Sequence, residues 1–298
     1  MWIPAVNREW LAKNALYIYA ITSGLASGLM AYALYYSTGR GSFWGITTGE
    51  SKIGGLAWSY FIDPGIADTY YHQIFKLANP LSDPTQMIVI GILLGGFLAS
   101  LASGEFTIRH FPNSWMVVQA LIGGFLLGYG ARMALGCNIG NYLSAWSSAG
   151  VNAVAFTAGM MPGAWVGTFI VERVFLFRVK PSRFNVTLPV WVQRFLLLPA
   201  ALALTALLFY SSVGVAVKLW FVFGVIFGLI GYLSKICWAT GFREITNPLY
   251  GGGRMLLATA LAILSYTLLT WPLIVLEAPI SLALARGVGV LQVFLGGF

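Results

Sequence analysis

Apolar stretches long enough to cross a lipid bilayer recur along the whole sequence. The hydrocarbon core of a bilayer is about 30 Å thick, and an α-helix needs roughly 20 apolar residues to cross it. The candidate spans lie at about 14–37, 86–104, 116–136, 149–171, 195–212, 217–236 and 253–276, and a last one starts near 283. Because a membrane β-strand needs only about 10 residues, these lengths predict an all-α fold, a polytopic transmembrane helical bundle with about eight spans.

The composition excludes an ordinary soluble domain. The chain is 58% hydrophobic and 9% charged, whereas soluble globular domains carry about 25% charged residues. Its 35 glycines include Gly-xxx-Gly spacings at 24/28, 91/95, 124/128, 159/163/167 and 224/228. Helices in lipid associate through close contact of small residues, because lipid tails are as apolar as the helices themselves. We therefore expect these glycines to pack helices together.

The basic residues predict the topology. The net charge is +8, but the basic residues lie in loops and at span ends, so we expect the lipid bilayer and no nucleic acid as a partner. The loop between the fourth and fifth spans carries Arg173, Arg178, Lys180, Arg183 and Arg194 against the single acid Glu172. The positive-inside rule places this loop in the cytoplasm. Counting spans backward places the N-terminus in the cytoplasm too, and the segment 38–85 outside.

Two pairs of similar segments predict an internal repeat. Residues 43–50 (FWGITTGE) and 237–244 (CWATGFRE) each place a Trp six residues before a Glu, and 122–125 (IGGF) matches 295–298 (LGGF). The first pair falls on opposite faces of the predicted topology, which indicates an inverted-topology repeat of the kind found in transporters. We expect one transmembrane domain over 1–298, with a first repeat at about 14–171, a linking helix at about 190–212 and a second, incomplete repeat at about 217–298.

The first candidate site surrounds Cys137. Glycines, among them Gly136, flank it in the segment 130–141 (GARMALGCNIGN), directly after an apolar span. The backbone is expected to break there at membrane depth, which is tolerated only inside protein or beside a cavity. A short helix that begins near Asn138 would point free N–H groups at an anion, and Arg132 is an intramembrane charge of the kind that usually has a function. The alternatives are an ordinary buried cysteine and an arginine that binds backbone carbonyls at a helix end.

The second candidate site surrounds Cys237. This cysteine follows the sixth predicted span and stands beside Lys235, Trp238 and Thr240. The alternative is an interfacial anchor, because Trp and Lys side chains favour the headgroup level of a membrane. That alternative accounts for the Trp and the Lys but not for the cysteine. The two cysteines of the chain form no disulfide framework.

No motif for catalysis or metal binding is present. The sequence contains no HExxH, Walker loop, Ser-His-Asp spacing or paired carboxylates, and His72 and His110 are far apart in sequence. We therefore expect neither an enzyme nor a cofactor or metal. Glu50, Glu244 and Glu277 all fall near predicted membrane interfaces, so no acidic proton relay is expected. This favours passive movement of a substrate, or coupling to its consumption in the cytoplasm.

These motifs resemble the YeeE/YedE sulfur-transport family of bacterial inner-membrane proteins, and more closely its YedE-like branch. The resemblance rests on residues 41–47 (GSFWGIT), 130–138 (GARMALGCN) and 235–240 (KICWAT) and covers nearly the whole chain in order. It implies an inverted-repeat transporter in which short helices enter from both faces and thiosulfate passes between cysteine thiols. Cys137 and Cys237 match two of the relay cysteines, and Phe43 stands where other members have a cysteine.

The resemblance implies a membrane transporter or channel for thiosulfate or a related small sulfur or selenium compound, located in the bacterial inner membrane. A membrane or cytoplasmic sulfur-carrier protein is an expected partner. The residues expected along the substrate pathway are Arg132, Gly136, Cys137, Asn138, Lys235, Cys237, Trp238 and Thr240. The second repeat stops at Phe298, before the family's final Gly-Gly-Cys motif and last helix. This motivates the alternative of a structural or accessory subunit of a larger membrane complex.

Overall fold

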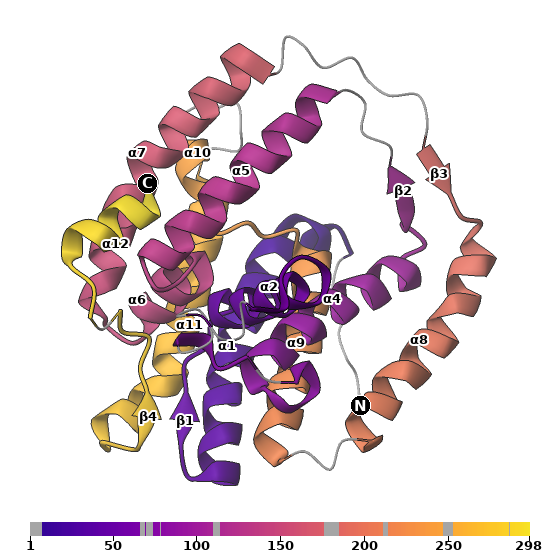
Figure 1. Ribbon diagram of the computed structural model, residues 1–298, viewed down its shortest axis with the longest axis horizontal. Helices are drawn as coiled ribbons and strands as arrows, with labels where there is room; N and C mark the ends of the chain where they lie inside the picture. Colours follow the sequence, from indigo (N-terminus) through magenta and orange to yellow (C-terminus); the bar gives the residue numbers. More distant parts are fainter. Residues whose placement is uncertain are drawn as a thin grey trace.

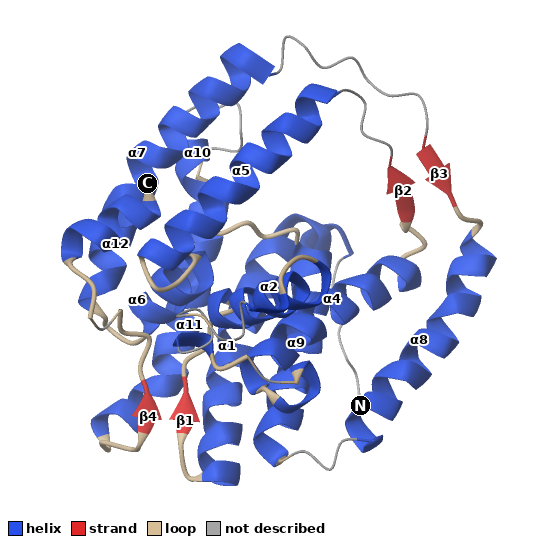
Figure 2. Ribbon diagram, in the orientation of Figure 1, coloured by secondary structure: helices blue, strands red, loops and turns tan. Residues whose placement is uncertain are grey.

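The computed structural model describes residues 8–65, 69, 74–77, 79–109, 114–175, 185–210, 214–246, 253–285 and 287–298. Nearly all of its regular structure is helical (Figures 1 and 2). Six helices in these ranges are long and apolar enough to cross a membrane: α1 (Arg8–Thr38), α4 (Pro84–Ala102), α5 (Ser114–Met133), α7 (Val151–Ile170), α9 (Val215–Ser234) and α11 (Arg254–Val275). The predicted all-α polytopic membrane bundle is confirmed.

Two segments differ from the predicted spans. The helix α8 (Val190–Tyr210) covers the predicted span 195–212 but has a shorter apolar stretch than the other six, at Val190–Ala206. The predicted span from near 283 is wrong, because irregular chain there leads to α12 (Val290–Gly297), which has eight residues.

The segment 38–85 is more ordered than an external loop. It contains β1 (Gly41–Ser42), the 15-residue helix α2 (Thr47–Phe61) and a short 3₁₀ turn at Pro80–Ser82. Strand β1 pairs in parallel with β4 (Ile280–Ser281), and β2 (Thr107–Arg109) pairs antiparallel with β3 (Asn185–Thr187). These strands have two or three residues each, so they tie loops together without forming a layer of the fold.

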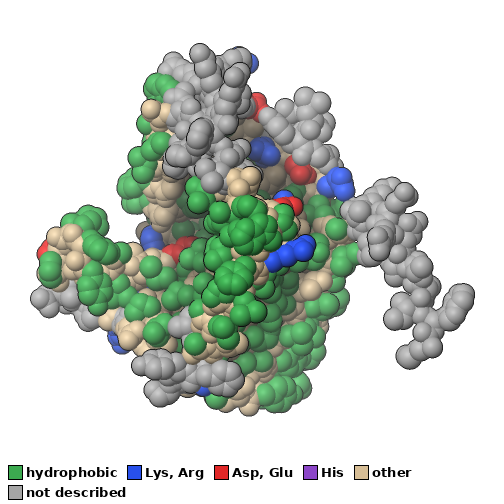
Figure 3. Space-filling view, turned by 90° about the vertical axis from the view of Figure 1, so that its right-hand side faces the viewer, with side chains coloured by type: hydrophobic (Ala, Val, Ile, Leu, Met, Phe, Trp, Pro, Cys, Tyr) green, Lys and Arg blue, Asp and Glu red, His purple; other side chains and the backbone are tan. Residues whose placement is uncertain are grey.

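Apolar side chains remain exposed over much of the surface. Figure 3 shows one face on which hydrophobic side chains predominate and charged ones are few. Leu121, Phe125 and Leu126 on α5 are each more than half exposed, as is Phe195 on α8. Soluble monomers rarely expose contiguous apolar patches of more than a few hundred Å². This surface is therefore consistent with a protein that has lipid as part of its solvent.

Glycines let the central helices approach closely. A Cβ added to Gly95 on α4 would lie 2.2 Å from the carbonyl oxygen of Val225 on α9. A Cβ added to Gly228 on α9 would lie 2.2 Å from the carbonyl oxygen of Ile92 on α4. Gly24 of α1 meets α11 in the same way. Any side chain at these positions would push the helices apart, so the expected role of these glycines in helix packing is confirmed.

Two glycines of α5 make no such contact with another helix. A Cβ added to Gly124 or Gly128 would have no neighbouring atom within 4 Å. Instead of meeting a helix, both residues line a cavity that is described below. On this helix the Gly-xxx-Gly spacing leaves space beside the backbone rather than closing it.

The helix contacts follow a paired arrangement. The helix α4 packs on α9, α1 packs on α11, and α1 also contacts α9. The helix α2 packs on α4, while the seven-residue helix α10 (Thr240–Thr246) packs on α11. If α1 is exchanged with α9, α2 with α10 and α4 with α11, the contact of α4 with α9 becomes that of α11 with α1. In the same way, the contact of α2 with α4 becomes that of α10 with α11. On the other side of the molecule from α8, α12 lies against α5 and α7 (Figure 1).

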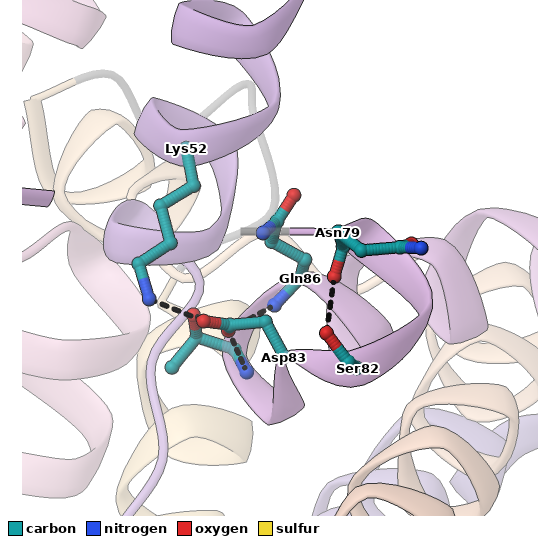
Figure 4. A network of polar contacts seen from close by, with 6 residues as sticks. Lys52, Asn79, Ser82, Asp83 and Gln86 are labelled. Carbon is teal, nitrogen blue, oxygen red and sulfur yellow. Dashed lines mark hydrogen bonds and ion pairs between the residues drawn. The ribbon is translucent and has the colours of Figure 1, made fainter. Parts of the chain in front are cut away.

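An ion pair fastens α2 to the start of α4. Asp83 precedes α4, and its Oδ1 accepts hydrogen bonds from the backbone N–H of Thr85 (2.8 Å) and of Gln86 (3.2 Å). Its Oδ2 pairs with the Nζ of Lys52 on α2 (Figure 4). Side-chain exposures of 14% for Lys52 and 11% for Asp83 leave little water to screen this pair. Burial alone would raise the pKa of Asp83, but the Lys52 ammonium group and the capping hydrogen bonds outweigh burial and lower it.

We predict that Asp83→Asn lowers the free energy of unfolding by about 3 kcal/mol, because it leaves the charge of Lys52 nearly buried without a partner. The loss should be measured by thermal unfolding in detergent. Since the pKa of Asp83 is lowered in the folded state, the stabilisation is complete above its unfolded pKa of about 3.9 and is lost as the pH falls through its folded pKa. Asp63→Asn, at an exposed carboxylate, is the matched control, and an equal melting temperature for both variants would refute the prediction.

Candidate functional site

The chain breaks out of helical geometry directly before Cys137. The helix α5 ends at Met133, Leu135 adopts a left-handed conformation (φ 52°), and the N–H of Gly136 bonds back to the carbonyl oxygen of Ala131 (2.9 Å). Cys137 is extended, and a new π-helical segment, η3 (Asn138–Ser144), begins after it. The break and the helix that begins at Asn138 lie where the sequence predicts them.

Asn141 holds this break together. Its Nδ2 donates hydrogen bonds to the carbonyl oxygens of Ala134 (2.7 Å) and Gly136 (3.0 Å), which the broken helix leaves without helical partners. Its Oδ1 accepts a hydrogen bond from Nδ2 of Asn152 on α7 (2.8 Å). A Cβ on Gly136 would lie 2.9 Å from the Asn141 amide, so only glycine admits this contact. The sequence motif includes Asn141, but its position alone does not reveal this role.

A second contact places α2 next to the break. The Oγ of Ser144, in η3, donates a hydrogen bond to the carbonyl oxygen of Trp44 (2.7 Å), which precedes α2. The ring of Trp44 stacks on Phe227 of α9 at 4.1 Å, and its Nε1 donates to Oγ of Ser27 (2.9 Å). These contacts fix the start of α2 relative to Cys137.

The segment after α9 brings in the second cysteine. The helix α9 ends at Ser234, and Lys235 adopts a left-handed conformation (φ 53°) with its N–H bonded to the carbonyl oxygen of Gly231 (3.0 Å). Cys237 lies in the irregular chain between α9 and α10, and its carbonyl oxygen accepts from the N–H of Thr240 (3.1 Å). Each cysteine thus lies on non-helical chain between two helices.

Both cysteines line one open cavity of about 730 Å³. We call it the thiol cavity. It lies between α5, the start of α2 and the segment after α9. Its lining residues are Ile46, Thr47, Glu50, Ser51, Gly124, Leu127, Gly128, Ala131, Arg132, Cys137, Asn138, Ile139, Ile236, Cys237 and Trp238. Five of the predicted pathway residues therefore meet here, although about 100 residues separate the two cysteines in sequence.

Arg132 supplies positive charge to the thiol cavity. Its guanidinium group lies over the ring of Phe75, 4.6 Å from the ring centroid, and its NH1 is 3.4 Å from Oγ of Ser51. Guanidinium stays charged in proteins and suits planar stacking. Cys137 is half-buried and Cys237 is exposed, so both thiols are accessible from the thiol cavity.

The start of α2 adds a second feature suited to an anion. Ile46, the residue before α2, offers no side-chain cap, and the first N–H groups of a helix have no partners within the helix. Thr47, the first residue of α2, is 7% exposed, and its Oγ1 has no hydrogen-bond partner. An uncapped helix start with a free buried hydroxyl favours a bound anion. Sequence reasoning missed Thr47 because nothing in residues 38–85 marks the start of an inserted helix.

The remaining predicted pathway residues lie outside the thiol cavity. Gly136 lines an adjoining pocket of about 260 Å³ together with Phe43, and Thr47 lines both spaces. Thr240 lines a third pocket of about 500 Å³ beside Arg243. Lys235 points elsewhere, since its Nζ lies 3.6 Å from the carboxylate of Glu105 and its side chain is 73% exposed.

Metal binding finds no support in the ranges that the structure covers. Within them, no group of three or more His, Cys, Asp or Glu side chains is placed to hold a metal ion. His72 and His110 lie outside the described residues.

The fold and the site define a multi-pass membrane protein with a cavity among its helices that two thiols and an arginine line. The chain belongs to the Sulphur transport family, whose family model matches residues 4–166. This confirms the resemblance inferred from the cysteine and glycine motifs. No solved structure matches the chain.

Curated relatives agree with the family assignment. The chain is 27% identical over 249 residues to "Probable transporter YedE" of Escherichia coli, an alignment that covers 80% of the chain and 61% of the relative. It is 30% identical over 172 residues to "Thiosulfate transporter TsuA" of the same species, which covers 56% of the chain and 40% of that relative. The chain thus spans about three fifths of the length of the YedE relative.

We predict that Asn141→Ala lowers the free energy of unfolding by about 2 kcal/mol, because two carbonyl oxygens lose their hydrogen-bond donor. Thermal unfolding in detergent measures the loss. Asn138→Ala, which removes an amide that lines the thiol cavity nearby, is the matched control and should cost about 0.5 kcal/mol or less. Equal stability of the two variants would show that Asn141 does not hold the break.

Proposed function

We propose that this protein is a membrane transporter or channel for thiosulfate or a related small sulfur or selenium compound. The observation that carries the proposal is the thiol cavity, which collects Cys137, Cys237 and Arg132 around the uncapped start of α2. Membership of the Sulphur transport family and the named relatives point to the same class of substrate. Transport rather than catalysis is proposed, since the relatives are named as transporters.

The chemistry of the cavity suits such an anion. Thiosulfate has hard oxygens and a large, soft terminal sulfur. Thiols are weak hydrogen-bond donors, so Cys137 and Cys237 can contact that sulfur without holding it tightly. Arg132 and the N–H groups at the start of α2 stabilise the negative charge of the oxygens. Conduction requires several moderate sites rather than one deep one, and two thiols in one cavity provide such a series.

The proposed path uses the thiol cavity and the two further pockets described above. The anion passes from the pocket of Gly136 and Phe43, past Thr47, to Cys137 and Asn138. It then reaches Cys237 and Trp238, and leaves beside Thr240. Lys235 is not placed on this path, because its ammonium group pairs with Glu105 outside the cavity.

We propose that the protein lies in the bacterial inner membrane with its N-terminus in the cytoplasm. The basic residues between α7 and α8 support this orientation through the positive-inside rule; of these, Arg178, Lys180 and Arg183 lie outside the described residues. An inverted repeat at about 14–171 and 217–298, joined by a linker at about 190–212, is supported by the contacts that exchange α1 with α9 and α4 with α11. A cytoplasmic or membrane sulfur-carrier protein would receive the substrate.

A second function belongs to a different class, an accessory subunit of a larger membrane complex. The helix α5 favours it, since Leu121, Phe125 and Leu126 are each more than 60% exposed. A partner subunit could cover this face. Stable copurification with other membrane polypeptides, combined with no transport by the isolated chain, is the result that this function requires.

We predict that Cys137→Ala and Cys237→Ala each reduce uptake of radiolabelled thiosulfate into proteoliposomes at least about tenfold. Each variant removes one donor from the series, and a tenfold loss corresponds to about 1.4 kcal/mol of barrier. Thr205→Ala on α8, away from the thiol cavity, is the control and should transport normally. If both cysteine variants take up thiosulfate as fast as the wild type, the thiols do not carry the anion. If the wild type shows no uptake, the accessory subunit is favoured.

A further inference from the structure

The thiol cavity contains a carboxylate that the proposed anion pathway does not need. Among the described residues that line the cavity, Arg132 carries a positive charge and Glu50 carries a carboxylate. The sequence suggested that Glu50 lies near a membrane interface and takes no part in a relay. The structure instead places it in the first turn of α2, on the wall that it shares with Cys137 and Cys237.

The packing of α2 fixes the position of Glu50. One residue before it, Gly49 lies against the backbone of Thr85, and a Cβ there would be 1.9 Å from the carbonyl oxygen of Thr85. Two residues after it, Lys52 is paired with Asp83. These two contacts hold the far side of α2 on α4. Since α2 cannot turn about its axis without breaking them, Glu50 stays on the cavity side.

The carboxylate of Glu50 has no direct counter-charge. Among the described residues, no ion pair or hydrogen bond to its side chain is found. The charge of Lys52 is directed to Asp83, and the guanidinium group of Arg132 stacks on Phe75 near Ser51. Among the described residues, the other titratable groups on the cavity wall are the two thiols. The side chain is open to the cavity, but the surrounding protein atoms still desolvate its carboxyl group and raise its pKa.

An anion in this cavity competes with the charge of Glu50. The anion is attracted by Arg132 and by the positive end of α2. At the same time the charge of the anion and the charge of Glu50 repel each other. A protonated Glu50 removes this repulsion and leaves Arg132 and the N–H groups to the anion. By reciprocity, an anion that binds better to the protonated form also raises the affinity of Glu50 for its proton.

We infer that Glu50 takes up a proton when the anion enters the thiol cavity, and that each anion crosses the membrane together with that proton. This inference rests on the proposed transport function. The proton passes from water on the side of uptake to a carboxylate oxygen of Glu50 and returns to water on the other side. For a dianion such as thiosulfate, one net negative charge moves in each cycle. Proton-coupled transport thus replaces the passive movement suggested by the sequence.

The decisive test is uptake of radiolabelled thiosulfate into proteoliposomes across a pH gradient of one unit, alkaline inside. Valinomycin and equal potassium concentrations hold the membrane potential at zero. Wild-type protein should accumulate thiosulfate about tenfold, because one proton per anion across one pH unit changes the equilibrium ratio about tenfold. Glu50→Gln, which resembles the protonated carboxyl group, should still equilibrate thiosulfate but should no longer respond to the gradient. Glu277→Gln, at an exposed acid outside the cavity, is the matched control and should behave as wild type.

A second measurement does not depend on transport. Addition of thiosulfate to purified wild-type protein in weak buffer should remove up to one proton per chain from solution, and Glu50→Gln should remove none. Wild-type uptake without a response to the gradient overturns the inference but leaves the proposed function in place. A response that persists in Glu50→Gln overturns the role of this residue. No wild-type uptake under any gradient overturns the proposed function itself.

Discussion

Non-helical backbone inside a membrane protein must find its hydrogen-bond partners within the protein, and the candidate site depends on how Asn141 meets this requirement. The helix α5 stops at Met133, and the carbonyl oxygens of Ala134 and Gly136 would be unpaired without the Asn141 amide. Because these groups are satisfied, Cys137 can lie on extended chain at the cavity wall. The same constraint explains Gly136, where any side chain would displace the amide.

Close helix packing on one side of the molecule leaves space on the other. The pairs α4–α9 and α1–α11 meet through glycines that bring backbones together. On α5, Gly124 and Gly128 have no neighbouring atom within 4 Å and line the thiol cavity instead. One residue type therefore has two opposite uses here, and the difference lies in whether a neighbouring helix reaches that face. The cavity has a positive charge on its wall because Arg132 lies at the last turn of α5, beside the break.

The two similar segments of the chain use their acidic residues differently. Glu244 is 6% exposed, and its carboxylate accepts a hydrogen bond from the N–H of Met255 at the start of α11 (2.9 Å). In the other segment, Asp83 performs the equivalent task for α4. This leaves Glu50, at the position that matches Glu244, without a structural task in the cavity. This asymmetry between the two segments supports the proposal that Glu50 carries the proton.

The sequence by itself determined the membrane class, the helical spans and the break at Cys137, because span length, apolar composition and glycine positions act locally along the chain. It also identified the family through its motifs. Only the tertiary structure decided that the chain at 282–285 is irregular, that α2 enters beside the cysteines and that Lys235 points away from them. It also decided that Glu50 faces the cavity. These outcomes depend on which faces of distant helices meet, and contacts such as Lys52 with Asp83 or Ser144 with Trp44 leave no periodic signal in the sequence.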